Sequence, residues 1–520
     1  MYVFDVNTAF GRRTEFDYDL SLGALLDELD AHAVAGALTC SLQSVHYNSH
    51  AGNAETLAAA AARPHLIPMA LLELREYFGL EAEITRSLRA GCRVFRFSTE
   101  SQPGLATSLL FRRALERLRG SGACLFFTLG GGLGSGWGQA EEIAHATAGA
   151  GLPVILADTN YQNMAEVMAV MQAYPHIYCE TNWLASVDAV EVMAEEVGVG
   201  RLLYGSGAPM RPMQKALNQV LETRLSDQDK TDILGGNAMR LLGLTPAQFA
   251  GRPQLNDLQP KRFADEIIDV HSHFGHWRIP IHNEGNNPTR MLERMRRYGV
   301  SRSIVSHYEG MRYDIVAGNR QVAEGIAGHP ELLGYVELNP HQLELSCAEM
   351  DRYYQLPNFV GCELELSHTV QPTGSAEVRA LMGEIARRGK PVLFEPQGAG
   401  DAEAERELAR QNPNLTIIHA HGFDVHWARV VADTPNICVE FNRSASCHHE
   451  IRDCLRVLGP ERLLFGSDQT LLSLGASIGL YLDAGLSPQA RRLVLRDNAQ
   501  RIFGLREGRS VKKGRRVSAP

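Results

Sequence analysis

Short runs of β-branched and apolar residues alternate with longer stretches of helical periodicity along the chain. Runs too short for a helix, each followed by a helical pattern, predict parallel β-strands joined by helices. In the second half the predicted strands are Ile267–Val270, Ser303–Ser306, Leu333–Leu338, Phe359–Leu366, Pro391–Phe394, Thr416–Ala420, Ile437–Phe441 and Leu463–Gly466. Eight strands in this rhythm fit a (β/α)₈ barrel, with a doubly wound open sheet as the structural alternative.

The same units recur in the same order in both halves of the chain. The segment from Asp5 to Gly11 matches Asp269 to Gly275, although both His of the later copy are replaced in the earlier one. An internal repeat of about 245 residues, the length of one barrel, predicts two tandem (β/α)₈ barrels. Four further pairs keep this order: Tyr47–Asn53 with Tyr313–Asn319, Gly91–Val94 with Gly361–Leu364, Arg201–Ser206 with Arg462–Ser467, and Asn237–Leu244 with Asn498–Leu505.

We therefore expect an α/β protein with one barrel in residues 1–247, a linker in 248–262 and a second barrel in 263–506. Proline and polar residues predict the linker. Residues 507–520 are basic and rich in small residues, which predicts a disordered tail. The glycine run from Gly130 to Gly136 lacks the spacing of a phosphate loop, so a loop over the barrel mouth is expected there.

Composition narrows the class of partner. The 520 residues are 44% hydrophobic and 21% charged, with a formal net charge of −9, which argues against nucleic acid as a partner. No apolar run approaches the length of a membrane span and no export signal is visible, so we expect a cytoplasmic protein without a membrane partner. Nine Cys without a CxxC pair predict reduced thiols.

Polar residues follow the strands of the second half at their carboxyl ends, where barrels of this kind carry their functional groups. His271 and His273 follow the first strand, and their spacing places both imidazoles on one face. Glu395 follows the fifth strand, His421 the sixth and Asp468 the eighth. Imidazoles and carboxylates converging at one rim predict a divalent-metal site.

The first half lacks these ligands. Its equivalent positions are predicted to be Asn7, Ala9, Phe127, Asp158 and Gly207, a set that cannot hold a metal ion. We therefore expect a degenerate first barrel that keeps the scaffold without the site.

Four motifs of the second half keep a characteristic order. They are the His-x-His strand, the Ala420-His421-Gly422 turn, the segment from Leu464 to Asp468, and the Asn-Ala-x-Arg signature that begins at Asn498. Together they resemble the amidohydrolase superfamily, specifically the amidohydrolase-2 group, which includes aminocarboxymuconate-semialdehyde decarboxylase, related aromatic-acid decarboxylases and hydrolases. The resemblance covers essentially the whole second half, whereas the first half shares only the scaffold.

The resemblance implies a role for each rim residue. His271, His273, Glu395 and Asp468 would hold one divalent ion, Zn²⁺ first, with Mn²⁺ or Fe²⁺ as alternatives. Asp468 would also take a proton from a metal-activated water, and His421 would polarise the substrate or shuttle a proton. The family usually has His on the fifth strand where this chain has Glu395, which puts metal preference and activity in question.

Contacts to a small-molecule substrate are expected from the same rim. Two roles remain open for Glu363 on the fourth strand: it could bridge to a second ion or contact the substrate. The stretch from Cys447 to Glu450 has the residue types of a metal site, but the helical pattern after it favours a helix start. Further candidates for substrate contact are Trp277, His307, Arg312 and Arg443, of which either Arg suits a substrate carboxylate.

The leading hypothesis is a metal-dependent hydrolase of a small amide, ester or lactone. A metal-dependent, non-oxidative decarboxylase of an unsaturated or aromatic acid is the alternative, because the group uses nearly the same residues for both reactions. The third hypothesis is a non-catalytic scaffold with a decayed site. Glu395 and the ligand-free first half support it. By the same resemblance the two barrels would pair within the chain, and further homo-oligomerisation is left open.

Overall fold

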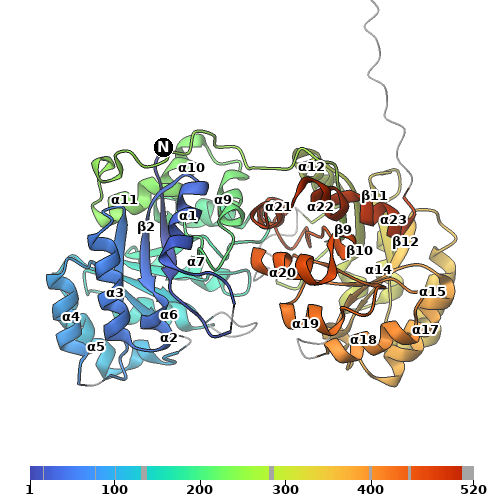
Figure 1. The fold of residues 1–520 in the computed structure, drawn as a ribbon, viewed down its shortest axis with the longest axis horizontal. Helices are drawn as coiled ribbons and strands as arrows, with labels where there is room; N and C mark the ends of the chain where they lie inside the picture. The colour runs from blue at the N-terminus through green and yellow to red at the C-terminus, as the bar shows by residue number, and fades with distance from the viewer. Residues whose placement is uncertain are drawn as a thin grey trace, which may run out of the picture.

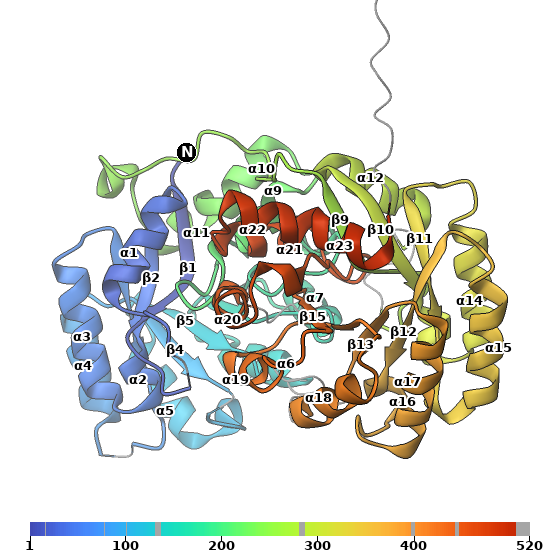
Figure 2. The same cartoon turned by 45° about the vertical axis from the view of Figure 1, so that its right-hand side comes forward.

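The computed structural model describes residues 1–15, 17–76, 78–99, 101–130, 137–279, 286–396, 401–442 and 447–505. It contains two 8-stranded parallel sheets, one in each half, with neighbouring strands in sequence order. Figure 1 shows the halves side by side, the first in blue to green and the second in yellow to red, and Figure 2 shows the same arrangement turned by 45°. The prediction of two tandem (β/α)₈ barrels is confirmed.

The observed strands overlap each strand that was predicted in the second half. The first sheet consists of β1 (Val3–Phe10), β2 (Val34–Ser41), β3 (Leu66–Leu71), β4 (Val94–Ser98), β5 (Cys124–Thr128), β6 (Val154–Ala157), β7 (Ile177–Glu180) and β8 (Leu202–Leu203). The second consists of β9 (Ile267–Phe274), β10 (Val300–His307), β11 (Leu332–Glu337), β12 (Phe359–Glu365), β13 (Val392–Glu395), β14 (Ile417–His419), β15 (Ile437–Glu440) and β16 (Leu463–Leu464).

Helices between the strands cover the outside of each barrel. In the first half they are α1 (Leu22–Ala31), α2 (Leu42–His46), α3 (Ser49–Ala61), α4 (Leu80–Arg89), α5 (Leu109–Leu118), α6 (Gln139–Thr147), α7 (Met164–Ala173), α8 (Ala189–Val197), α9 (Met213–Leu221), α10 (Asp227–Thr231) and α11 (Asn237–Leu242). In the second they are α12 (Pro288–Tyr298), α13 (Tyr308–Arg312), α14 (Ile315–Gly325), α15 (Leu343–Tyr353), α16 (Leu366–Thr369), α17 (Ala376–Arg388), α18 (Ala402–Gln411), α19 (Val425–Val430), α20 (His448–Leu458), α21 (Leu474–Asp483), α22 (Pro488–Arg492) and α23 (Asn498–Phe503).

The helix α12 illustrates why these segments fold as they do. The Asn287 side chain accepts a hydrogen bond from the backbone N–H of Arg290, proline fills the first turn, and Gly299 ends the helix in the left-handed region. Its buried residues Met291, Leu292, Met295 and Tyr298 recur at helical spacing and face the barrel. Among the described helices, none is long and apolar enough to cross a membrane, and all nine Cys are free thiols, as predicted.

A buried carboxylate on the first strand helps to close each barrel. Asp269 accepts hydrogen bonds from the backbone N–H of Ser467, at 3.0 Å, and of His271, at 3.2 Å. The hydroxyls of Ser467 and Ser272 donate to the same carboxylate. In the first barrel Asp5 likewise accepts from the backbone N–H and the hydroxyl of Ser206. The carboxylate therefore ties the first strand to the segment that follows the eighth.

The predicted linker lies against the first barrel. Phe249 is fully buried there, with its ring centroid 5.8 Å from that of Phe4. The backbone N–H of Leu255 donates to the carbonyl of Met1, and Asn218 donates to the carbonyl of Lys261. The linker thus runs along the first barrel on its way to the second.

The two barrels pack through α9 and α21, the long helices that follow the eighth strand of each barrel. All residues of α9 are buried, and so is most of α21, and Figure 1 shows both helices at the junction of the halves. A side chain on Gly479 would lie 2.6 Å from the backbone N and Cα atoms of Lys215, so glycine permits this close approach. Ser186 and Leu472 also form an antiparallel β-bridge between the barrels.

The contact has the symmetry of a pair of like subunits. His32, next to the end of α1, places its Nε2 2.9 Å from Asp483 of the other barrel. At the equivalent place Tyr298, at the end of α12, donates its hydroxyl hydrogen to Glu222 of the first barrel at 2.9 Å. Asp483 and Glu222 both stand at the ends of the paired helices α21 and α9. The predicted pairing of the halves is therefore a pseudo-two-fold interface.

Gly479→Ala should destabilise the protein by about 1–3 kcal/mol, because the new methyl group meets the backbone of α9 and forces the barrels apart. Gly383→Ala in α17 is the matched control, since a Cβ there meets nothing within 4 Å, and it should be neutral or stabilising by about 0.5–1 kcal/mol. Urea unfolding measures both. Equal effects of the two substitutions would contradict the close packing of α9 on α21.

Candidate metal centre

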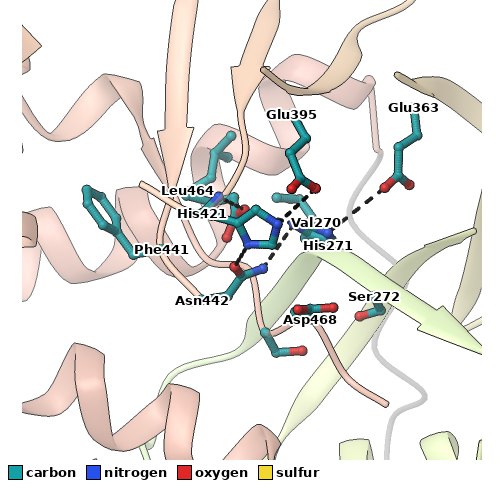
Figure 3. A network of polar contacts seen from close by, with 12 residues as sticks. Val270, His271, Ser272, Glu363, Glu395, His421, Phe441, Asn442, Leu464 and Asp468 are labelled. Atoms are coloured by element: carbon teal, nitrogen blue, oxygen red, sulfur yellow. Dashed lines mark hydrogen bonds and ion pairs between the residues drawn. The ribbon is translucent and has the colours of Figure 1, made fainter. Parts of the chain in front are cut away.

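His271 and His273 both lie near the end of β9, and the imidazole of His271 lies among the side chains of Glu363, Glu395 and His421 (Figure 3). The Nε2 atoms of His271 and His273 are 2.9 Å apart. Nδ1 of His271 lies 2.8 Å from Glu440 and 2.9 Å from the amide nitrogen of Asn442, and Nδ1 of His273 lies 2.6 Å from the Ser306 hydroxyl. If these Nδ1 atoms carry the protons, both Nε2 lone pairs face inward as metal ligands.

Asp468 brings a carboxylate to the same point. Its backbone N–H donates to the carbonyl of His271 at 2.8 Å, and its Oδ1 lies 3.4 Å from Nε2 of His273. One ligand atom each from His271, His273 and Asp468 lie within 4.8 Å of one another, and all three residues are buried. Burial raises the pKa of Asp468 well above its usual value, and the charge of His421 opposes that rise.

Glu363 reaches toward the imidazoles from β12. Its Oε1 lies 4.0 Å from Nε2 of both His271 and His273. Its Oε2 is buried and has no hydrogen-bond partner among the described residues. Burial, reinforced by the carboxylate of Glu337, raises the pKa of Glu363 well above its usual value. Buried carboxylates facing two neutral imidazoles fit a divalent cation, which would satisfy these atoms.

Glu395 pairs with His421 at the end of β13. The Oε2 of Glu395 lies 3.0 Å from Nε2 of His421, and Nδ1 of His421 contacts the amide oxygen of Asn442. Burial lowers the pKa of His421, but the charge and hydrogen bond of Glu395, together with the charges of Asp468 and Glu440, outweigh burial and raise that pKa to about 10. In this arrangement Glu395 holds a charged imidazolium, and its role as a metal ligand stays a prediction.

An aromatic and basic group lines the mouth above these residues. The guanidinium of Arg312 lies 4.4 Å from the ring centroid of Trp277, and it donates to Nδ1 of His368 at 3.2 Å. His307 accepts a hydrogen bond from the backbone N–H of Glu309 and caps the start of α13, and its contact with the substrate stays a prediction. Arg443 lies outside the described residues.

Sequence reasoning missed the carboxylate and the hydroxyl that orient the two imidazoles. Glu440, which orients His271, closes the seventh strand, and Ser306, which orients His273, lies near the end of β10. A carboxylate at a strand end was the available signal for Glu440. The Cys447 cluster begins α20 as predicted.

The repeat misaligned the fourth and fifth strands of the first barrel. Val94 pairs with the fourth residue of β3, and Gly361 pairs with the fourth residue of β11, so Val94 and Gly361 are equivalent. Arg96, two residues after Val94, therefore holds the position of Glu363, which the sequence match assigned to Arg93. By the same register Thr128, and not Phe127, holds the position of Glu395. The match of Gly91–Val94 with Gly361–Leu364 placed the fourth strand wrongly by three positions, because a short sequence match carries no information on strand register.

The rim of the first barrel carries a different polar set. Asn7 and Ala9 replace the imidazoles, and a Cβ at Gly207, in the position of Asp468, would lie 2.8 Å from the side chain of Arg211. The Arg211 guanidinium lies 4.1 Å from the ring centroid of Trp183. Among the described residues, all groups of His, Cys, Asp and Glu arranged for a metal ion belong to the second half.

The comparison with family models agrees with the duplicated barrel. The amidohydrolase family model (Amidohydro_2) matches residues 17–244 and 268–505, and no curated protein sequence matches the chain. Solved structures that align with 46% of this chain include a dihydroxybenzoic acid decarboxylase from Polaromonas with bound manganese (15% identity, 97% of that chain, TM-score 0.38). Another is a proposed 2-pyrone-4,6-dicarboxylic acid hydrolase from Pseudomonas putida (20% identity, 46% of this chain, 97% of that chain, TM-score 0.36).

Wild-type protein purified from metal-supplemented cultures should carry about one more transition ion per chain than the His271→Ala/His273→Ala double variant, because the two imidazoles are the inward-facing neutral ligands. Elemental analysis measures the difference. Asn7→Ala, at the equivalent position in the first barrel, is the control and should leave the metal content unchanged. Equal metal content in the double variant and the wild type would contradict the assignment of His271 and His273 as metal ligands.

Proposed function

The chain belongs to the amidohydrolase family, and from that premise we propose that its second barrel is a metal-dependent hydrolase of a small amide, ester or lactone. The convergence of His271, His273 and Asp468 within 4.8 Å supports the proposal most directly. His271, His273 and Asp468 would hold the ion, Zn²⁺ first with Mn²⁺ or Fe²⁺ as alternatives, and the ion would lower the pKa of a water to about 7 and polarise a carbonyl oxygen.

Asp468 is the proton acceptor in this proposal. Its carboxylate stands beside the imidazole of His273, and its backbone is fixed to the first strand by the hydrogen bond to His271. As the attacking water forms its bond to the carbonyl carbon, a carboxylate in this place takes the proton that the water gives up. Because this hydrogen bond fixes the backbone of Asp468, little reorganisation is needed at that step.

His421 is the proton donor. Glu395 keeps this imidazole charged, and Asn442 fixes the orientation of the ring through Nδ1. When the bond from carbon to the leaving nitrogen or oxygen breaks, the leaving atom takes a proton, and the imidazolium can supply it. Glu395 then acts by holding His421 rather than by touching the substrate.

Arg312 defines the class of substrate in the proposal. Its guanidinium lies over Trp277 at the mouth, and burial lowers its pKa from the usual value. A guanidinium stacked on an aromatic ring suits a carboxylate attached to a flat group. We therefore expect a substrate that carries an acid group besides the bond that is cleaved.

The same lining also favours a second candidate, non-oxidative decarboxylation. Trp277 and Tyr308 pack with ring centroids 5.0 Å apart beneath Arg312, which suits an aromatic acid. In that reaction the bond to the carboxyl carbon breaks, CO₂ leaves, and a proton from His421 or Asp468 replaces it on the ring carbon. The two reactions differ in their products.

Purified protein loaded with Zn²⁺ or Mn²⁺ should therefore be tested against small lactones, esters and amides that carry a carboxylate, with acid release followed in a pH-stat. Hydroxybenzoic acids are tested in parallel for CO₂ release. Acid release without CO₂ supports the hydrolase, and CO₂ release supports the decarboxylase. Absence of both from metal-loaded protein across the two panels would favour the scaffold hypothesis.

Asp468→Asn should lower turnover of the substrate found in that screen by about 10²-fold or more, since the amide keeps the shape but cannot take the proton. The exposed Asp351→Asn is the control and should retain wild-type activity. Both variants should show wild-type unfolding curves. Full activity of Asp468→Asn would overturn the hydrolytic mechanism.

A further inference from the structure

A second group of metal-ligand residues lies at the start of α20, outside the barrel mouth. Cys447, His448 and His449 offer one sulfur and two nitrogen ligand atoms that all lie within 4.8 Å of one another. Cys447 precedes the first turn of the helix, and the two His form part of that turn. Figure 1 shows α20 at the junction of the two halves. The three candidate ligands are therefore the residues at which α20 begins.

His448 is the unexplained member of this group. It is 1% exposed, and neither of its ring nitrogens has a hydrogen-bond partner among the described residues. Its ring lies against that of His449, with centroids 4.0 Å apart. Burial lowers the pKa of His448 well below its usual value, so the ring is neutral. A buried polar ring with two unused nitrogens costs stability, and a metal ion is one partner that removes this cost.

The other two residues face the first barrel. The Cys447 thiol donates to the carbonyl of Met210 at 2.8 Å, and Nε2 of His449 lies 3.4 Å from the carbonyl of Pro209. The ring of His449 also stacks on Tyr18 of the first barrel, with centroids 4.2 Å apart. The cluster is thus enclosed by both barrels.

We propose that Cys447, His448 and His449 form a second metal site, for a thiolate-preferring ion such as Zn²⁺, at the seam between the barrels. One thiolate and two imidazoles are a ligand set that Zn²⁺ favours. The site shares no residue with the cluster of His271, His273 and Asp468, which has no sulfur ligand.

Ion binding at the seam has a defined proton balance. Burial raises the pKa of the Cys447 thiol to about 12, so the thiol keeps its proton in the ion-free protein. The sulfur must release this proton to the solvent as its bond to the ion forms, which makes binding tighter as pH rises. The charges around the sulfur are of both signs: Arg211 and Lys215 favour the thiolate, whereas Glu450 opposes it.

Binding at this place also acts on stability. An ion held only by the folded chain stabilises it by mass action. The ligands belong to the second barrel and contact backbone carbonyls of the first, so packing of the barrels encloses the site. Zn²⁺ should therefore raise the unfolding midpoint of the packed pair.

The test uses full-length protein carrying His271→Ala/His273→Ala, so that the mouth cannot hold an ion, with Co²⁺ as a coloured substitute for Zn²⁺. Titration should give about one Co²⁺ per chain and a thiolate-to-cobalt charge-transfer band in the near ultraviolet. Added Zn²⁺ should bleach the band. Cys447→Ser and His448→Gln should abolish or weaken it, whereas Cys347→Ser in α15 should retain it.

A second measurement needs no substitution in the cluster. In the wild-type chain, alkylation of Cys447 should be slower with Zn²⁺ than without it and should recover on chelation, as read by peptide mass spectrometry. A folded double variant without a thiolate band would overturn the proposal. A band that persists in Cys447→Ser would also overturn it, and so would an alkylation rate of Cys447 that is the same with and without Zn²⁺.

Discussion

The rest of the structure depends on the buried carboxylate that joins the first strand of each barrel to the segment after the eighth. Asp269 and Asp5 are fully buried, and burial raises their pKa values to about 6 and about 7. Such a carboxylate is stable only when several donors surround it. Asp269 binds the backbone of His271 and of Ser467, so it holds two candidate metal ligands, His271 and Asp468, at a fixed separation.

One scaffold thus carries two different rims. Asp5 closes the first barrel in the same way, yet Asn7, Ala9 and Gly207 remove the ligands, and the side chain of Arg211 takes the space beside Gly207. Arg96 stands where the second barrel has Glu363, which reverses the charge at that position. The first barrel keeps its packing surface instead. Through α9 and the loop that carries Ser186 it presses on the segment that follows Asp468.

Sequence pattern was enough to predict the barrels, because strand and helix periodicity is a property of neighbouring residues and the internal repeat is visible in the sequence itself. It also predicted the cluster of His271, His273 and Asp468, since the carboxyl ends of parallel strands meet at one rim. It failed where the answer depends on register or on which side chains meet. The place of Arg96 needed the strand pairing, and the contact of Glu395 with His421 needed the geometry of two strand ends. The close approach at Gly479 depends on two helices far apart in sequence.

The central claim is that this duplicated chain holds a divalent ion at the mouth of the second barrel and not at that of the first, between the imidazoles of His271 and His273 and the carboxylate of Asp468. Anomalous X-ray diffraction from crystals grown with Mn²⁺ tests it directly. The account predicts an anomalous peak bounded by these three residues and none at the rim formed by Asn7, Ala9 and Gly207. A peak of equal height in both barrels, or none beside His271 in crystals soaked with excess Mn²⁺, would contradict it.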